Sequence, residues 1–327
     1  MGRTAKRDGM LKAPLLGGKI IAAVDGIEIF HSYRRGCDAC CVRRVKIKTN
    51  GEEVEVDQFY HRYVVLALMA EDFPLPLGAW PIRPGEDEVA PALELIRQAR
   101  RQYGPRFYDV LVADGLYLQA PFVQAVRDLG LGVIFTLKEN QPCLLEEALQ
   151  FTNGRPSDRI LYEGNNETLS LWDEKNLWWD AAGRDVRVIR CRRERTVRER
   201  APKSAKDGHV TRCVARSWTE RTEIHENIFA AILDHPASAE GIYRAGKSRW
   251  DIDANLFQDL TMNWGLKHMK VHKPVAVMAT LLILLTAYTL FMFYATRHVL
   301  SRIHRTKPTL IAIAKHLAQS VVSGVPP

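Results

Sequence analysis

The chain has 327 residues, and its 46 Lys and Arg against 38 Asp and Glu give a net charge of +8 and an isoelectric point near 9.2. This length allows a large buried core and indicates more than one substructure, for example one domain with an insertion. The basic excess is compatible with an anionic polymer as partner but is too small to establish one.

The cysteine pattern indicates a cytoplasmic protein with reduced thiols, because six cysteines occur without a signal peptide at the start. Cys37 and Cys40 form one Cys-x-x-Cys pair. A zinc ribbon needs a second such pair. The other four cysteines provide none at ligand spacing, and they are Cys41, Cys143, Cys191 and Cys213. The sequence therefore predicts no zinc ribbon.

Two apolar runs each lead into an Asp-Gly pair. After residues 1–18, which are basic and predict a linker or tail, the run 18–30 contains Asp25-Gly26, and the run 108–117 contains Asp114-Gly115. A β-strand holds its end rigidly, and a glycine there lets the backbone turn without crowding a ligand. The two strand-end aspartates predict a shared metal site. Ordinary Asp-Gly turns are the alternative interpretation.

The elements between and after these runs alternate between strand and helix. Strands are predicted at 43–50, 54–70 and 132–137, and helices at 85–101, 119–129 and 142–151. Together with the two Asp-Gly strands, the order is βββαβαβα. An α/β fold with a ribonuclease H-like mixed sheet flanked by helices is therefore expected, and residues 19–152 form its first part.

From residue 153 the composition changes, and residues 153–235 predict a β-rich insertion with a basic face. Strand alternation around residue 190 places arginines on both faces, an arrangement suited to lying along phosphates. The candidate DNA-binding residues here are Arg190, Arg192 and Arg193. A solvated edge hairpin is the alternative.

Residues 236–327 predict a helical second part. In the helix expected over 248–265, the 3.6-residue period puts Asp253 inside an apolar stripe with Trp250, Phe257 and Leu260. An aspartate on a buried face requires a partner. That partner is either Arg249, one turn earlier, or a metal ion.

The uncharged segment 275–296 is long enough to cross a bilayer. It also follows the acidic helix directly, and the sheet would lack an apolar covering helix without it. We therefore expect a buried helix of the catalytic domain and no stable membrane association, with a single-span membrane anchor as the alternative.

Short motifs in a fixed order support a family resemblance over about residues 19 to 295. They are Val24-Asp25-Gly26, His31-Ser32, Tyr60-His61-Arg62, Pro84-Gly85-Glu86-Asp87-Glu88, Ala113-Asp114-Gly115-Leu116-Tyr117, Leu137-Lys138-Glu139-Asn140, Arg249-Trp250 and Trp264-Gly265-Leu266. The chain resembles bacterial insertion-sequence transposases of the IS4 type. That family uses a DDE acid triad on a ribonuclease H-like fold.

The resemblance implies that Asp25, Asp114 and Asp253 are the catalytic triad and bind Mg²⁺, for which Mn²⁺ can substitute. It implies cleavage and strand transfer on double-stranded DNA, both transposon ends and target, by a homodimer. Arg249 would hold a phosphate or orient Asp253. The other expected DNA contacts outside the insertion are Lys138, Lys267 and Lys270.

Four departures from the family pattern motivate a second hypothesis. The third acid is usually Glu and is Asp253 here, the tyrosine expected three residues before Arg249 is Gly246, and the lysine expected seven residues after the acid is Leu260. A further N-terminal DNA-binding region, usual in the family, is also not found. A decayed or truncated transposase that binds DNA without cutting it is therefore the alternative function.

Overall fold

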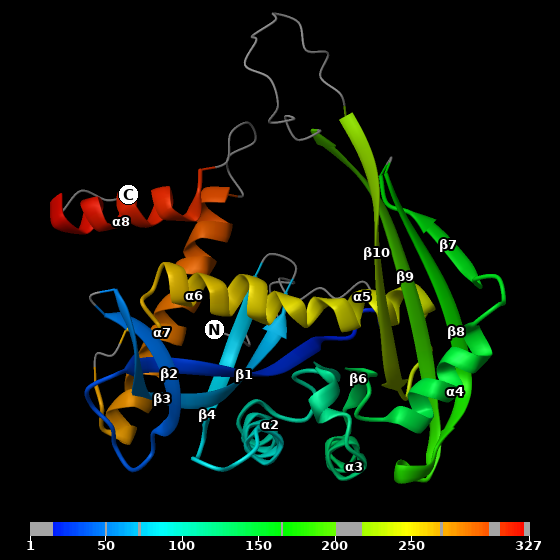
Figure 1. Cartoon of the computed structure of the whole chain (residues 1–327), viewed down its shortest axis with the longest axis horizontal. Helices are drawn as coiled ribbons and strands as arrows, with labels where there is room; N and C mark the ends of the chain where they lie inside the picture. The colour runs from blue at the N-terminus through cyan, green and yellow to red at the C-terminus, as the bar shows by residue number, and fades with distance from the viewer. Residues whose placement is uncertain are drawn as a thin grey trace, which may run out of the picture.

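The computed structural model describes residues 16–49, 51–70, 73–164, 166–200, 218–268, 271–300 and 308–323. Within these ranges a single mixed sheet of ten strands runs through the molecule (Figure 1). Its strand order is β2-β3-β1-β5-β6-β10-β9-β8-β7, and β4 also pairs with β3. The predicted fold class, a mixed α/β sheet flanked by helices, is confirmed.

The centre of the sheet consists of strands that are buried on both faces. They are β1 (Ile21–Ser32), the inner half of β3 (Glu52–Met69), β5 (Val110–Ala113) and β6 (Gly132–Thr136). β1 pairs antiparallel with β3 and parallel with β5, and β5 pairs parallel with β6. Because these strands lack a solvated face, they occur as near-continuous apolar runs, which made β5 and β6 identifiable from the sequence.

One strand of the core was missed. β4 (Pro74–Ile82) pairs with the inner half of β3, whereas β2 (Cys41–Thr49) pairs with the outer half. The antiparallel meander is therefore β1-β3-β4, and β2 is a hairpin arm beside it. Prolines at 74, 76 and 81 concealed β4, since proline argues against a strand except at a sheet edge.

Helices cover both faces of the sheet (Figure 1). On one side lie α2 (Val89–Tyr103), α3 (Ala120–Asp128) and α4 (Pro142–Thr152). On the other lies a run made of α5 (Ala239–Ser248), the π-helix η4 (Ile252–Phe257) and α6 (Gln258–Met262). α5 packs on the inner strands, and η4 packs on β1.

The predicted helix 85–101 begins later than expected. Asp87 accepts hydrogen bonds from the backbone N–H groups of Val89 and Ala90, at 3.0 and 3.4 Å, so it caps the helix from outside. Glu86, Asp87 and Glu88, which the prediction placed in the first turn of the helix, therefore lie before its first residue.

The β-rich insertion is continuous with the central sheet. Its strands are β7 (Arg159–Tyr162), β8 (Glu167–Trp179), β9 (Arg184–Arg200) and β10 (Trp218–Ile232). All neighbouring pairs are antiparallel, and the inner end of β10 pairs with β6 from Phe229↔Thr136 to Ile232↔Val133. The insertion thus extends the sheet from its β6 edge.

At the other end, α7 (Pro274–Tyr294) packs against β4 and leads through η5 (Ala295–Leu300) to α8 (Leu310–Ser323). Leu281, Leu285 and Tyr288 are buried, but Ile283 and Leu290 are 69% and 55% exposed. The expectation of a buried helix is therefore right for one face and wrong for the other. By length and composition alone, residues 274–300 could cross a membrane.

Gly246 of α5 lies directly against Phe229 of β10. A Cβ at this position would lie 2.5 Å from Cδ1 of Phe229. The tyrosine that the family pattern places here therefore has no room, and Tyr243, one turn earlier, packs edge-on to Phe229 with ring centroids 6.3 Å apart.

We expect Gly246→Ala to lower the free energy of unfolding by about 1–3 kcal/mol, because an added methyl group overpacks this contact. Urea unfolding followed by circular dichroism measures the change. Gly78→Ala in β4 is the control, since its Cβ would meet Leu95 at an ordinary 3.4 Å. Equal effects of the two substitutions would contradict the packing argument.

Candidate active site

Asp25 lies within β1 and not at its end. β1 continues through Gly26 to Ser32, and Asp25 pairs with Val65 of β3. The predicted Asp-Gly turn is therefore wrong here. Gly26 instead makes room for a neighbour, because a Cβ there would lie 2.1 Å from Oε2 of Glu88.

Asp114 does stand at a strand end, as predicted. It follows β5 and precedes the 3₁₀ turn η2 (Gly115–Tyr117). Since Ala23 pairs with Val112 in the parallel β1–β5 ladder, Asp25 and Asp114, each two residues farther on, lie level with each other on adjacent strands. Neighbouring strands are about 4.8 Å apart, so the two carboxylates share one region of the sheet.

Arg249 joins the first acid to the third. Its Nη1 donates to Oδ2 of Asp25 at 2.6 Å and lies 3.4 Å from Oδ2 of Asp253. The arginine side chain is 8% exposed, against 15% for Asp25 and 49% for Asp253. The predicted pairing of Arg249 with Asp253 is therefore present, but the shorter contact is to Asp25. Arg249 is too deeply buried here to lie along a DNA backbone.

Asp253 is less buried than its place in the predicted stripe implied. It lies in η4, where Ile252 and Leu256 are fully buried while Asp253 is half-exposed. The 3.6-residue period fails because η4 is a π-helix, which has more residues per turn; single turns of this kind are frequent at functional sites. The wider turn moves Asp253 to the rim, where it remains within reach of Arg249.

The charges around the acids shift their pKa values in opposite directions. Burial, then the negative charge of Asp253, raises the pKa of Asp25 to about 7 despite Arg249. Burial would also raise the pKa of Asp114, but hydrogen bonds from Lys138 and Gly115 and the charges of Arg249 and Lys138 lower it overall. Lys138 Nζ lies 2.8 Å from Oδ1 of Asp114.

Two further residues of the site were absent from the predicted set. Glu88, next to Gly26, forms an ion pair with Arg62 at 3.3 Å. Tyr117 is fully buried, and burial followed by the negative charges of Glu88, Asp25 and Asp114 raises its pKa well above the usual value. The only sequence signal for either residue was its place in a family motif.

The lysines predicted to contact DNA are exposed where the structure describes them. Lys138 is 55% exposed and Lys267 is exposed, whereas Lys270 lies outside the described residues. Lys138 also borders a groove of about 630 Å³, lined by Gly115, Thr136, Asn140 and Glu226 among others. This groove opens directly beside Asp114.

The three candidate arginines of the insertion have acidic partners within the protein. Arg190 is 12% exposed and contacts Glu226 at 3.1 Å; Arg192 contacts Glu194 at 2.9 Å, and Arg193 pairs with Glu167. The role of all three in DNA binding stays a prediction.

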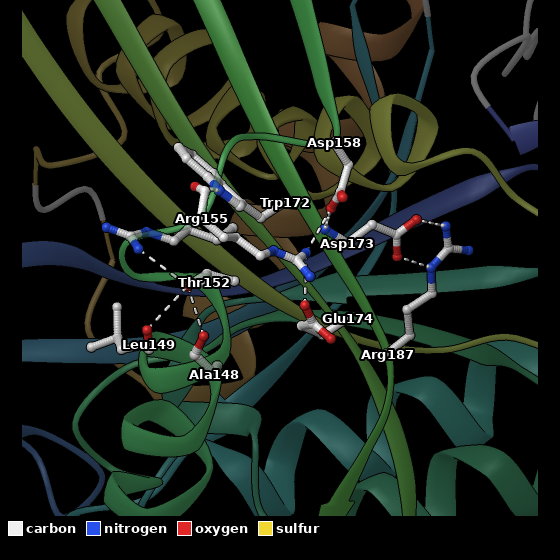
Figure 2. A network of polar contacts seen from close by, with 10 residues as sticks. Ala148, Leu149, Thr152, Arg155, Asp158, Trp172, Asp173, Glu174 and Arg187 are labelled. Carbon is white, nitrogen blue, oxygen red and sulfur yellow. Dashed lines mark hydrogen bonds and ion pairs between the residues drawn. The ribbon is translucent and has the colours of Figure 1, made fainter.

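The same kind of pairing holds the insertion together. Figure 2 shows the paired guanidinium and carboxylate of Arg187 and Asp173, with contacts of 2.8 and 2.7 Å, and Arg155 between Asp158 and Glu174. On this part of the insertion, arginine charge is largely neutralised by neighbouring acids.

The three aspartates are suited to holding a divalent cation. Carboxylate oxygens are the hard ligands that Mg²⁺ and Mn²⁺ prefer. Asp25 and Asp253 share one guanidinium, and burial together with the negative charge of Asp253 outweighs Arg249 and raises the pKa of Asp25 to about 7.

Residues 82–290 match the family model described as the transposase DDE domain, which covers well over half of the chain. The chain belongs to the transposase DDE domain family. Asp114 and Asp253 lie inside the matched span, and Asp25 precedes it. DDE transposase domains use divalent metal ions, in agreement with the donor set found here. The IS4 subtype stays a prediction.

Among solved structures, the chain is similar to one described as the cryo-EM structure of a piggyBac transposase synaptic complex with hairpin DNA. The identity is 12% and the TM-score 0.46, over 93% of this chain and 52% of that one. The chain thus spans about half the length of that transposase. No curated protein sequence matches this DDE transposase domain.

The raised pKa of Asp25 predicts a pH-dependent stability in the metal-free protein. The pKa of Asp25 is about 7 in the folded protein and 3.8 in the unfolded chain. The stability that this group contributes is therefore fully present below about pH 4 and is lost as the pH rises through 7. Asp25→Asn removes that loss, so its stability relative to the parent should increase from pH 5 to pH 8, by at most roughly 3 kcal/mol.

Urea unfolding in EDTA at several pH values measures how the difference in stability between variant and parent changes with pH. A pH-independent loss of stability caused by the substitution does not affect this change. Glu94→Gln, which removes an exposed carboxylate from an ion pair with Arg97 on α2, is the matched control. A pH-independent difference between Asp25→Asn and the parent would contradict the assignment.

Proposed function

We propose that the chain is the transposase of an IS4-type insertion sequence and catalyses metal-dependent DNA strand cleavage and strand transfer. The observation that carries the proposal is the convergence of Asp25 and Asp253 on Arg249, with Asp114 level with Asp25 on the neighbouring strand. A phosphoryl-transfer site requires several acids from distant parts of the chain to lie together. If each Asp-Gly pair were only an ordinary turn, there would be no reason for the three acids to be close to one another.

In this proposal, Asp25, Asp114 and Asp253 hold Mg²⁺, or Mn²⁺ in its place. Such ions would supply Lewis-acid chemistry for an in-line displacement, in which a water or 3′-hydroxyl is activated and the leaving oxygen is stabilised. The protein's own residues position the acids. Arg249 keeps Asp25 and Asp253 close to each other, and Lys138 holds Asp114.

Double-stranded DNA is the proposed partner, with transposon ends and target bound in turn by a homodimer in the cytoplasm. The groove beside Asp114 contributes Lys138 and Asn140 at its wall, which suits contacts to a phosphate near the acids. Lys267 and the exposed charges of the insertion would follow the backbone farther away, and Lys270, outside the described residues, is a further candidate contact.

The second candidate is a protein that binds DNA without cutting it. Two observations favour it: Asp253 is one methylene shorter than the family's usual glutamate, and its contact to Arg249, at 3.4 Å, is longer than that of Asp25. A carboxylate that falls short binds Mg²⁺ poorly, because Mg²⁺ demands near-octahedral ligands at about 2.0–2.1 Å.

We expect Asp25→Asn and Asp114→Asn each to abolish metal-dependent strand cleavage while leaving DNA binding within about twofold, because an amide loses the charge that holds the cation. Cleavage of DNA carrying the element's ends, and electrophoretic mobility shifts on the same DNA, measure the two properties. Asp251→Asn, on the same helical run as Asp253, is the control. Undiminished cleavage in either variant would remove that residue from the site.

Asp253→Glu distinguishes a weakened site from a lost one. Asp253 is half-exposed, so a longer side chain has room, and we expect cleavage in Mg²⁺ to increase about tenfold, equivalent to about 1.4 kcal/mol. Mn²⁺ should partly restore cleavage by the parent protein. Absence of cleavage by parent and variant in both metals would favour the binding-only candidate.

A further inference from the structure

A second cluster of metal-ligand side chains lies away from the acids. The Sγ atoms of Cys37 and Cys40 are 3.6 Å apart, and Nε2 of His61 lies 3.8 Å from the first and 3.5 Å from the second. His272 approaches from the segment before α7, and its ligand atom and the two sulfurs lie within 4.8 Å of one another. The rings of His61 and His272 meet edge-on, with centroids 6.1 Å apart.

These separations agree with a tetrahedral zinc site. With Zn–S of about 2.3 Å and Zn–N of about 2.0–2.1 Å, tetrahedral angles require about 3.8 Å between two sulfurs and about 3.6 Å between sulfur and nitrogen. The three measured distances among Cys37, Cys40 and His61 lie within about 0.3 Å of those values. A disulfide would require about 2.05 Å between the sulfurs.

The polar atoms of His272 give an independent indication. Both ring nitrogens are shielded from solvent, and neither has a hydrogen-bond partner among the described residues. A buried imidazole without partners is costly. A cation between His272 and the two thiols would satisfy one of the nitrogens.

We propose that Cys37, Cys40, His61 and His272 bind one Zn²⁺ ion. Two thiolates with two imidazoles form a ligand set that suits zinc, and four protein ligands make a closed, structural site. The zinc-ribbon criterion missed it because the second pair of ligands consists of histidines, one on β3 and one far along the chain.

The proposed site joins three parts of the protein: the connection after β1, the strand β3 and the segment that follows the acidic helical run. Cys37 and Cys40 belong to the β1–β2 connection, His61 pairs with Ile29 of β1, and His272 follows the acidic helical run. Near it, the N–H of His31 donates to the carbonyl of Lys267 at 3.3 Å. Zinc would therefore fix the chain leaving α6 against the outer part of β1.

This site is separate from the candidate active site. Asp25 pairs with Val65, whereas Ile29 pairs with His61, so four residues of strand, about 13 Å, lie between the two. The inference therefore does not depend on the chain being an active transposase.

The test is the zinc content of the purified, reduced full-length chain, expressed with added zinc and dialysed before elemental analysis. We expect about one zinc ion per chain in the parent. The double variant with both Cys37→Ser and Cys40→Ser, and the single variant His272→Ala, should each hold less than about a tenth of that amount. Cys41→Ser and Cys143→Ser are the thiol controls and should retain the metal, as should Asp25→Asn with Asp114→Asn.

Cobalt gives a second readout on the unmodified protein. Co²⁺ added to the metal-free, reduced chain should produce the visible bands of a tetrahedral ion and a thiolate-to-metal charge-transfer band, both removed by stoichiometric zinc. His272→Cys, which keeps a ligand at this position, should still bind one ion if His272→Ala fails to fold.

Three results would overturn the proposal. The first is a parent protein that contains no zinc and shows no tetrahedral cobalt bands. The second is full zinc content in the double variant of Cys37 and Cys40. The third is loss of zinc from the variant that carries both Asp25→Asn and Asp114→Asn. The last result would assign the metal to the acids.

Discussion

The fold of this transposase domain depends on the contact between a buried guanidinium and two carboxylates. Arg249 and Asp25 are separated by 224 residues in sequence, and their contact joins the helical layer to the central strand of the sheet. A charge buried to this degree destabilises the fold unless it is paired. Each partner therefore requires the other, and the helical run that carries Asp253 is held in one position over β1. Lys138, in the loop after β6, pairs with Asp114 in a more exposed contact.

The sequence allowed most of the alternation of strands and helices to be predicted, because buried strands and amphipathic helices differ in period. What it could not provide are features decided by tertiary contacts. The proline-rich β4 is a strand only because it pairs at the edge of β3. Gly26 was taken for a turn residue, although its function is to admit Glu88. The attachment of β10 to β6 has no local sequence signal.

The site was predictable in part, for related reasons. Asp25 and Asp114 were found from their apolar lead-ins, since strand pairing brings such residues together. Asp253 was found from helical periodicity, but the π-turn changed its burial. Of the second cluster, only the Cys37 and Cys40 pair had a sequence signal, because its histidines join it only through the register of β1 and β3 and the return of the chain after α6.

The joining of β10 to β6 also bears on how this protein can evolve. An insertion connected by two flexible ends can be exchanged or deleted as a module. Here β10 supplies hydrogen bonds to the edge of the central sheet, and α5 packs on insertion strands and core strands together. Removal of the insertion would expose the β6 edge to pairing with other chains and would take away the part of the surface under α5 that β8, β9 and β10 provide. The insertion and the catalytic core are therefore expected to change together, as one inherited unit.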